Sequence, residues 1–307
     1  MSGSTFEPTE CAPQIHAGGP RACATNRSPA DLRLSKLHQR SPDINENLET
    51  LEAQAAELGN LGLEYRALGN ILKARDSHQR SLVIEEKLGR LDRQAIQLGN
   101  LGICFQMLGD LPNAVELIQR SLAIDETLGN IEGQAAGLGS LGICYQMLGD
   151  IHKAIDLIRR SLDVSETIGR PEAQAIALGN LGICHQSLGD IPMARELIRR
   201  SLAINQMLGN LEGQATGLGN LGTCYQMLGD IHEAIDFHQR AYSIAEKLES
   251  LEGQARHLAN LGICYQAKSD AIEARNHLTR ALTLYETMGI PPDHPHVELL
   301  QSALKML

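Results

Sequence analysis

The chain has 307 residues, with 37 acidic and 27 basic side chains and a formal net charge of -10. Only 3% of the residues are aromatic, so the chain lacks both the clustered basic surface and the stacking side chains that nucleic acids bind. The acidic balance also disfavours an anionic membrane surface, and no run approaches the ~20 apolar residues that span a bilayer. Residues 1–30 contain no apolar segment typical of a secretory signal. We therefore expect a cytoplasmic protein without nucleic-acid or membrane partners.

Most of the chain is repetitive. Residues 51–290 divide into six blocks of 40 that align without a gap. Length alone would fit two globular domains, but a period of 20–50 residues is typical of solenoids, in which each unit packs only on its neighbours. The repetition predicts one elongated body with degenerate ends.

Each block has the pattern of two amphipathic helices joined by a tight turn. In the third block, residues 131–170, Leu138 and Leu141 lie on one stripe of a first helix. Gly149 is expected to end that helix in the left-handed conformation, and Asp150 to cap the start of the second helix. Because one pair cannot cover its own apolar stripe, neighbouring pairs must stack. The prediction is an all-α solenoid of helix-turn-helix repeats.

Five of the seven cysteines recur at intervals of 40 residues; they are Cys104, Cys144, Cys184, Cys224 and Cys264. Equivalent atoms of stacked helix pairs lie on the order of 20 Å apart, which is too far for a disulfide or a shared metal ion. We interpret these cysteines as small buried hydrophobic residues. No phosphate loop, serine elbow or paired-carboxylate motif occurs. We therefore expect no metal, no cofactor and no enzymatic activity.

The blocks resemble the tetratricopeptide repeat. Its pattern is represented in the third block by Leu138, Leu141-Gly142, Tyr145, Ala154 and Ile158. Three departures are a leucine in place of the first tryptophan, the lack of a proline closing the second helix, and 40 residues instead of ~34. The longer unit resembles the repeats of Pins-type adaptors and, more loosely, of kinesin light chains. This resemblance implies a right-handed α-solenoid of six repeats whose first helices line a concave groove.

The resemblance also implies which columns of residues face the groove. One column consists of amides: Asn60, Asn100, Asn180, Asn220 and Asn260. A second column consists of Arg66, Gln106, Gln146, Gln186, Gln226 and Gln266. Apolar members are Ile103, Ile143 and Ile183, with Met107, Met147 and Met227 beside the glutamines. Amide side chains donate and accept hydrogen bonds, so such a ladder can bind the backbone of a peptide or helix while the apolar residues bury its side chains. The alternative is a solvated ladder without a ligand.

Two further features concern the ligand. Glycine or alanine occupies the column in which other tetratricopeptide proteins carry the lysines that clamp chaperone tails, and only Arg66 and Arg256 offer positive charge in the groove. The ligand is therefore expected to be apolar and not strongly acidic. The glycine of each Leu-Gly pair is expected to let the partner helix approach closely. A second glycine column, three residues earlier, is expected to leave bare backbone beside the groove; this column is Gly59, Gly99, Gly139, Gly179 and Gly219.

Both ends of the chain depart from the repeat. Residues 1–30 have the composition of an irregular tail, and residues 31–50 resemble the second helix of a decayed repeat whose ragged edge offers a surface for stacking on another copy. In residues 291–307, Val297 and Leu300 begin the apolar stripe of a capping helix. We interpret the nearby acidic and histidine residues as part of a proline-rich turn rather than as metal ligands.

These features together predict a non-enzymatic scaffold or adaptor that binds a peptide or helix segment of a protein partner in the concave groove. The first alternative is a regulatory sensor module of a larger signalling assembly. The second is a self-stacking structural repeat with an empty groove.

Overall fold

The computed structural model describes residues 48–307, and this part of the chain consists of thirteen helices and no strand. Twelve of them form six consecutive pairs: α2 (Leu48–Ala67) with α3 (Ile71–Leu88), α4 (Leu91–Met107) with α5 (Leu111–Leu128), α6 (Ile131–Met147) with α7 (Ile151–Thr167), α8 (Pro171–Ser187) with α9 (Ile191–Met207), α10 (Leu211–Leu228) with α11 (Ile231–Lys247), and α12 (Leu251–Ala267) with α13 (Ala271–Thr287). The last helix is α14 (Pro295–Lys305).

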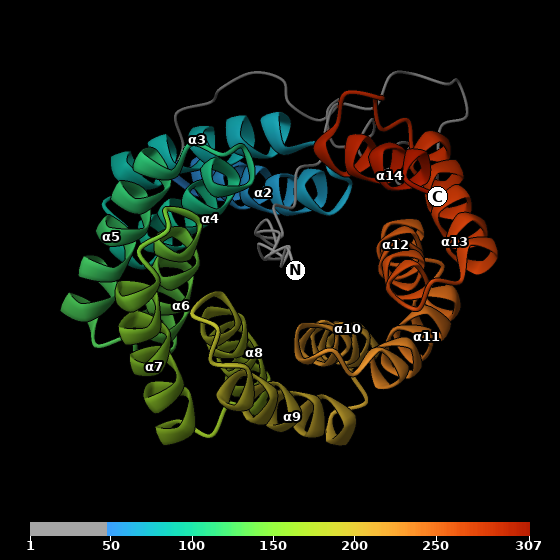
Figure 1. The fold of residues 1–307 in the computed structure, drawn as a ribbon. Helices are drawn as coiled ribbons and strands as arrows, with labels where there is room; N and C mark the ends of the chain where they lie inside the picture. The colour runs from blue at the N-terminus through green and yellow to red at the C-terminus, as the bar shows by residue number, and fades with distance from the viewer. Residues whose placement is uncertain (1–47) are drawn as a thin grey trace.

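The pairs stack into a strongly curved array (Figure 1). The first helix of each pair lies on the inner side of the curve and the second helix on the outer side. Each second helix packs against its own partner and against the first helix of the next pair, and successive first helices also touch one another. The all-α solenoid predicted from the 40-residue period is confirmed.

The Leu-Gly pair of each first helix forms the centre of the core. Leu101 and Ile118 are buried in the second repeat, and a Cβ atom added at Gly102 would collide with the Ile118 side chain. The same Cβ would lie 3.2 Å from the carbonyl oxygen of Ala114. Glycine is therefore needed here because α5 crosses α4 at that point, and the predicted packing role of this glycine column is confirmed.

Turns end the helices where the sequence predicted. Gly149 has φ 83°, and the Asp150 side chain accepts a hydrogen bond from the backbone N–H of Lys153 at 3.1 Å. Two turns lack the usual glycine, and in them Glu249 and Ser269 adopt φ 53° and 63°. Positive φ is costly for residues with a Cβ, so these two turns are strained relative to the others.

The second glycine column does not leave bare backbone toward the inner face, and that expectation is wrong. A Cβ at Gly139 would lie 3.2 Å from Oγ of Ser161, whose hydroxyl donates to the Ala135 carbonyl oxygen at 2.7 Å. Equivalent serine bonds join the two helices in the first, second and fourth repeats. At Gly59 and Gly219 a side chain from the next repeat fills the space instead. The column therefore serves helix packing.

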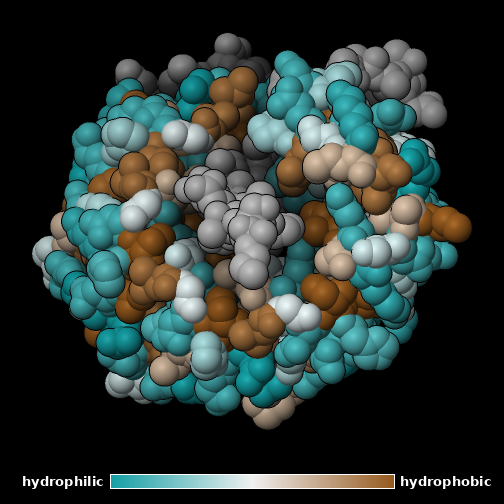
Figure 2. Space-filling model, in the orientation of Figure 1, coloured by the Kyte–Doolittle hydropathy of each residue, from teal (hydrophilic) through white to brown (hydrophobic). Residues whose placement is uncertain are grey.

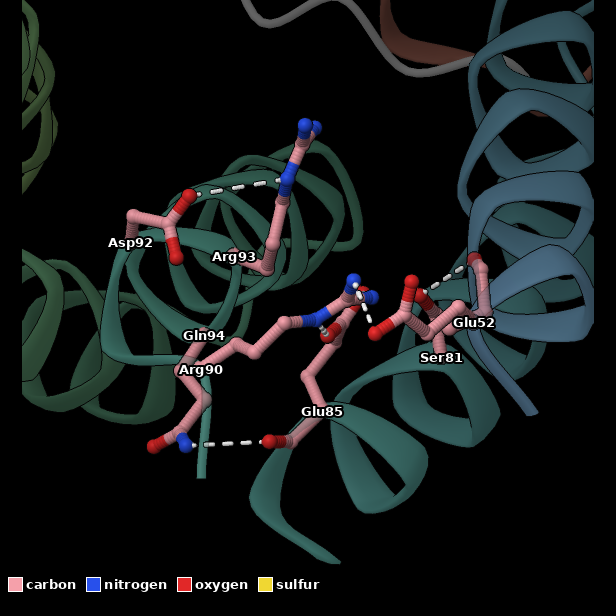
Figure 3. A network of polar contacts seen from close by, with 8 residues as sticks. Glu52, Ser81, Glu85, Arg90, Asp92, Arg93 and Gln94 are labelled. Atoms are coloured by element: carbon pink, nitrogen blue, oxygen red, sulfur yellow. Dashed lines mark hydrogen bonds and ion pairs between the residues drawn. The ribbon is translucent and has the colours of Figure 1, made fainter. Parts of the chain in front are cut away.

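A glutamine near the start of an inner helix ties each repeat to the preceding one. Gln94 Nε2 donates to the Glu85 backbone oxygen at 3.1 Å, and equivalent bonds recur from Gln134, Gln174, Gln214 and Gln254. At the first junction Arg90 also contacts the Glu85 carboxylate at 2.8 Å and the Glu52 carboxylate at 3.3 Å (Figure 3). The glutamine bonds cap backbone carbonyl groups at the C-terminal ends of the outer helices.

The C-terminal helix covers the last repeat. Val297, Leu300 and Ala303 of α14 are buried in one cluster with Leu278 and Tyr285 of α13, as expected for a capping helix. The predicted half repeat at residues 31–50 and the tail at residues 1–30 lie almost entirely outside the described residues. Stacking through the N-terminal edge therefore stays a prediction.

Candidate functional site

One stripe of each inner helix is not covered by other helices. In α8 it consists of Glu172, Ile176, Asn180, Ile183 and Ser187, which follow one another at intervals of three or four residues. Glu172, Ile176 and Ser187 are exposed, and Asn180 and Ile183 are half-buried. We call this stripe and its equivalents on α2, α4, α6, α10 and α12 the inner-face stripes.

The inner-face stripes contain most of the residues predicted for the groove. In the amide column Asn60 is exposed, Asn100, Asn180 and Asn260 are half-buried, and Asn220 is only 6% exposed. Ile103, Ile143 and Ile183 are half-buried, as are Met107 and Met147, whereas Met227 is exposed. The second predicted column is half-buried as well; it consists of Arg66, Gln106, Gln146, Gln186, Gln226 and Gln266. The asparagines, isoleucines and methionines therefore belong to the inner-face stripes, and the arginine and the glutamines lie one residue before the last position of each stripe.

Some of the amides are already used between repeats. Gln186 Nε2 donates to the Asn220 backbone oxygen at 3.1 Å, and Arg66 Nη1 donates to Asn100 Oδ1 at 3.4 Å. Gln106 Nε2 lies 3.7 Å from the sulfur of Met147. Part of the predicted ladder thus holds neighbouring inner helices together, and only its remaining donors and acceptors can serve a ligand.

The sequence analysis missed the most exposed apolar residues of this face. Ile176 is 64% exposed and Ile96 is 48% exposed, each one helical turn before the asparagine of its own helix. Their column reads Ala56, Ile96, Ala136, Ile176, Thr216 and Arg256. Extending the asparagine stripe four residues toward the N-terminus would have found it. Hydrophobic residues also gather toward the inner side of the array, whereas its outer margin is mainly hydrophilic (Figure 2).

An acidic residue begins every inner-face stripe. These residues are Glu52, Asp92, Glu132, Glu172, Glu212 and Glu252. Glu52 is the fifth residue of α2, and the other five lie in the first turn of their helices, where a negative charge stabilises the helix dipole. Glu52 also makes an ion pair with Arg90, which precedes the next inner helix α4, and Glu132 makes one with Arg170, which precedes α8. The acidic column therefore has a structural explanation.

Two junctions between repeats carry buried histidines. His78 contacts Gln97 between the first and second repeats, with Nδ1 2.9 Å from Oε1. The rings of His238 and His257 lie 6.2 Å apart between the fifth and sixth. Burial lowers the pKa of His238 to about 4, and burial together with the positive charge of Arg256 lowers the pKa of His257 to about 3. Both imidazoles are therefore neutral at physiological pH.

The five recurring cysteines are free and fully buried, which confirms their interpretation as small core residues. Burial raises the pKa of the Cys104, Cys144 and Cys184 thiols to about 11, so none of these is an activated nucleophile. Residues 48–307 bring no three histidine, cysteine or acidic side chains together as a metal site. Within the same range, no helix is both long and apolar enough to cross a bilayer.

Several solved structures share this fold. The chain superposes on BtubC (BKLC) from P. vanneervenii with a TM-score of 0.58 and 22% identity, covering 80% of this chain and 94% of the other. A Rap protein complexed with competence and sporulation factor gives a TM-score of 0.67 at 13% identity, covering 89% and 78%. A signal transduction ATPase with numerous domains and a tetratricopeptide repeat sensor, from Pyrococcus horikoshii, gives 0.65 at 14% identity, covering 84% of this chain and 39% of the other.

These identities are low, so the superpositions establish the fold alone. No curated protein matches the chain. The family model of the tetratricopeptide repeat matches residues 52–127, 133–207 and 213–287, which together cover well over half of the chain. Each matched segment spans two helix pairs of the array. The chain therefore belongs to the tetratricopeptide-repeat family.

Proposed function

We propose that the protein is a non-enzymatic scaffold or adaptor that binds an extended or helical segment of a protein partner along the inner-face stripes. The observation that carries this proposal is the exposure of Ile96 on α4 and Ile176 on α8, two of the helices on the inner side of the array. Large apolar side chains at a concave surface favour burial by a partner, and the concave surfaces of solenoids are their usual binding surfaces.

The chemistry of the stripes supports a peptide rather than a small molecule. On α4 and α8 an asparagine lies between two isoleucines, so a ligand chain finds both a surface that buries its side chains and groups that bond its backbone. Among the proteins of similar fold, the Rap protein is complexed with a competence and sporulation factor. A ligand held by the concave side of this chain would be a comparable use of the fold.

A sensor role is the second candidate. One protein of similar fold combines an ATPase with a tetratricopeptide repeat sensor, and this chain spans 39% of it. In that role the same inner face would bind the signal, and an effector on another chain would respond. The free buried thiols fit a reducing compartment such as the cytoplasm in either role.

The test compares two exposed isoleucines that differ in their position on the array. Ile176→Asp introduces a charge on the inner side of α8, whereas Ile272→Asp introduces the same charge on the outer helix α13, where Ile272 is 81% exposed. Each variant and the wild type would be used to capture proteins from native lysate, after circular dichroism shows equal helix content.

We expect a partner to be retained by Ile272→Asp and lost by Ile176→Asp. The combined variant Asn100→Ala, Asn180→Ala and Asn260→Ala is expected to weaken capture of the same partner without abolishing it, because the apolar contacts remain. Retention of every partner by Ile176→Asp would contradict binding at the inner face. Loss of the partner from the Ile272→Asp variant alone would place the interaction on the outer helices.

A further inference from the structure

The outer face of α13 differs in charge from the other outer helices. Each of the five preceding outer helices carries an acidic residue four positions before an arginine; these acidic residues are Asp76, Glu116, Asp156, Glu196 and Asp236. In α13 the acidic residue is replaced by Asn276, whereas the arginine is retained as Arg280. An exposed stripe of α13 is thereby left with two arginines and no acidic residue; it consists of Ile272, Arg275, Asn276, Thr279 and Arg280.

The first outer helix, α3, shows what the acidic residue does in this stripe. Its residues at the equivalent positions include an arginine followed by an acidic residue, Arg75 and Asp76. The Arg75 guanidinium lies 2.9 Å from the Asp76 carboxylate. In α13 the equivalent Arg275 makes no hydrogen bond or ion pair with any residue that the structure describes. The change from aspartate to asparagine thus leaves the charge of Arg275 uncompensated.

Arg280 has no carboxylate partner among the described residues either. Its Nη2 donates to the Tyr242 hydroxyl at 3.0 Å, and that hydroxyl donates to Glu246 Oε1 at 2.8 Å. In three other outer helices the equivalent arginine contacts a carboxylate directly; the pairs are Arg120 with Glu86, Arg200 with Glu166, and Arg240 with Asp236. Both arginines of the α13 stripe therefore retain donors for a carboxylate of another molecule.

An apolar side chain lies one helical turn before these charges. Ile272 is 81% exposed, the highest value of any large apolar residue in the described part of the chain. Together with Ala271, Asn276, Thr279 and the two arginines it lines an open hollow whose surface is mainly apolar. Exposed apolar surface with a polar rim is typical of a protein interaction site.

The acidic residues of the same region are either engaged or distant. The Asp270 side chain accepts from the Glu273 backbone N–H at 3.2 Å, and the Glu273 carboxylate lies 3.6 Å from His277 Nε2. Glu286 follows Arg280 by six residues, which is ~9 Å along a helix. The chain as a whole carries a net charge of -10, but at physiological ionic strength charges beyond ~8–10 Å are largely screened. The local positive charge therefore decides which partner this face attracts.

We propose that the outer face of α13 binds an acidic amphipathic segment of a second protein partner. Carboxylates of the segment pair with Arg275 and Arg280, and an apolar side chain of the segment covers Ile272. Guanidinium groups bind carboxylates through parallel hydrogen bonds, so arginine suits this role. Helix α13 lies on the outer side of the array, apart from the inner-face stripes (Figure 1). One chain can therefore hold two partners at once, and the inference does not depend on binding at the inner face.

The experiment begins with a library of random dodecapeptides displayed on phage and selected on the full chain. Enriched peptides are then synthesised, and their binding is measured by fluorescence anisotropy. Peptides that lose binding to Ile176→Asp are set aside as ligands of the inner face. The remaining peptides are tested on variants of the α13 stripe.

Two variants change the charge of the stripe, and each has a matched control. Asn276→Asp restores the acidic residue that the other outer helices carry, so the fold should tolerate it. Its control, Gln119→Glu, adds a negative charge at an exposed position of the outer helix α5. Arg275→Gln removes one arginine of the stripe, and its control, Arg159→Gln, removes an exposed arginine from the outer helix α7.

The remaining peptides are expected to share acidic residues next to an apolar one. Asn276→Asp and Arg275→Gln should each weaken their binding about tenfold, because one adds a like charge beside the carboxylates and the other removes a partner. Both controls should bind these peptides as the wild type does. Ile272→Asp should also weaken binding, since it places a negative charge where the apolar contact is expected.

The proposal would be overturned if no such peptide remained, if the peptides had no acidic preference, or if Asn276→Asp bound them as tightly as the wild type. Light scattering tests a different occupant. A wild type that dimerises while Asn276→Asp stays monomeric would show that the face binds a second copy, and the proposed partner would then be wrong. The same holds if a synthetic peptide from residues 1–47 binds the face in place of the acidic peptides.

Discussion

Nδ1 of His78 lies 2.9 Å from Oε1 of Gln97 in the buried contact between α3 and α4. The two positions change together along the array. At the second junction Ile118 replaces the histidine and Gly137 the glutamine, and the side chain nearest to Gly137 is the apolar Leu122. The first junction therefore uses a buried polar pair where the central junctions use apolar packing.

This pairing predicts a non-additive response to mutation. Gln97→Ala is expected to lower the free energy of unfolding by about 1–3 kcal/mol because it leaves Nδ1 of His78 buried without a partner. The double variant His78→Ile and Gln97→Ala is expected to recover most of that loss, since it recreates the apolar junction. Urea midpoints of both variants measure the effect, and equal destabilisation by the single and double variants would refute the pairing.

The fifth junction predicts a dependence of stability on pH. His238 and His257 have a pKa of about 4 and about 3 in the folded chain, lowered mainly by burial, whereas the unfolded pKa is near 6.5. The unfolded state therefore binds protons that the folded state rejects, and stability falls as the pH decreases below about 6.5. Between pH 7 and pH 5 the loss is up to about 2 kcal/mol for each histidine.

The variant His238→Ile is expected to lose less stability than the wild type over this pH range, because it removes one of the two buried groups. His232→Gln, an exposed histidine on the same helix, is the matched control and should follow the wild type. Thermal midpoints at several pH values provide the measurement. Parallel curves for wild type and His238→Ile would show that another group causes the pH dependence.

Two helical glycines predict opposite effects of the same substitution. Gly102→Ala should lower the free energy of unfolding by about 1–3 kcal/mol, because its Cβ would collide with Ile118 and approach a backbone oxygen. Gly137→Ala should raise stability by up to about 1 kcal/mol, since its Cβ would meet Leu122 at an ordinary 3.4 Å and alanine favours the helix. Urea denaturation of both variants measures these changes. If the two free energies of unfolding changed in the same direction, the distinction between the two glycines would be wrong.

The turns without glycine predict simple stabilising changes. Glu249→Gly and Ser269→Gly should each raise the thermal midpoint, by an amount equivalent to about 0.5–1 kcal/mol, because glycine adopts positive φ without strain. Gly229→Ala, at φ 83°, is the reciprocal control and should lower the midpoint. A midpoint unchanged by all three substitutions would mean that these turns are not strained.

The cysteines predict slow thiol chemistry. With Cys11 and Cys23, which lie outside the described residues, replaced by serine, the remaining five thiols should react with Ellman's reagent only after urea is added. Their side chains are fully buried, and burial raises the pKa of Cys264 to about 12. Rapid reaction of any of these thiols in the native protein would show that the array opens at that repeat.

The sequence by itself determined the helices, the turns and the stacking. Leu101 and Gly102 recur every 40 residues on one stripe, and Gly149 with Asp150 marks a helix boundary, because helix periodicity and capping depend on residues within one or two turns. Stacking followed from the same pattern, since an uncovered apolar stripe must meet its copy in the next repeat. These features are local or repeated, so one block predicted the others.

Only the tertiary structure decided how groups in different repeats meet. Gln186 bonds to Asn220 across 34 residues, and Gly139 faces the hydroxyl of Ser161 rather than the groove. The exposure of Ile176 likewise depends on how the helices cross. A side chain at the edge of a helical stripe is free or covered according to the position of the neighbouring helix, and the crossing geometry of packed helices sets that position.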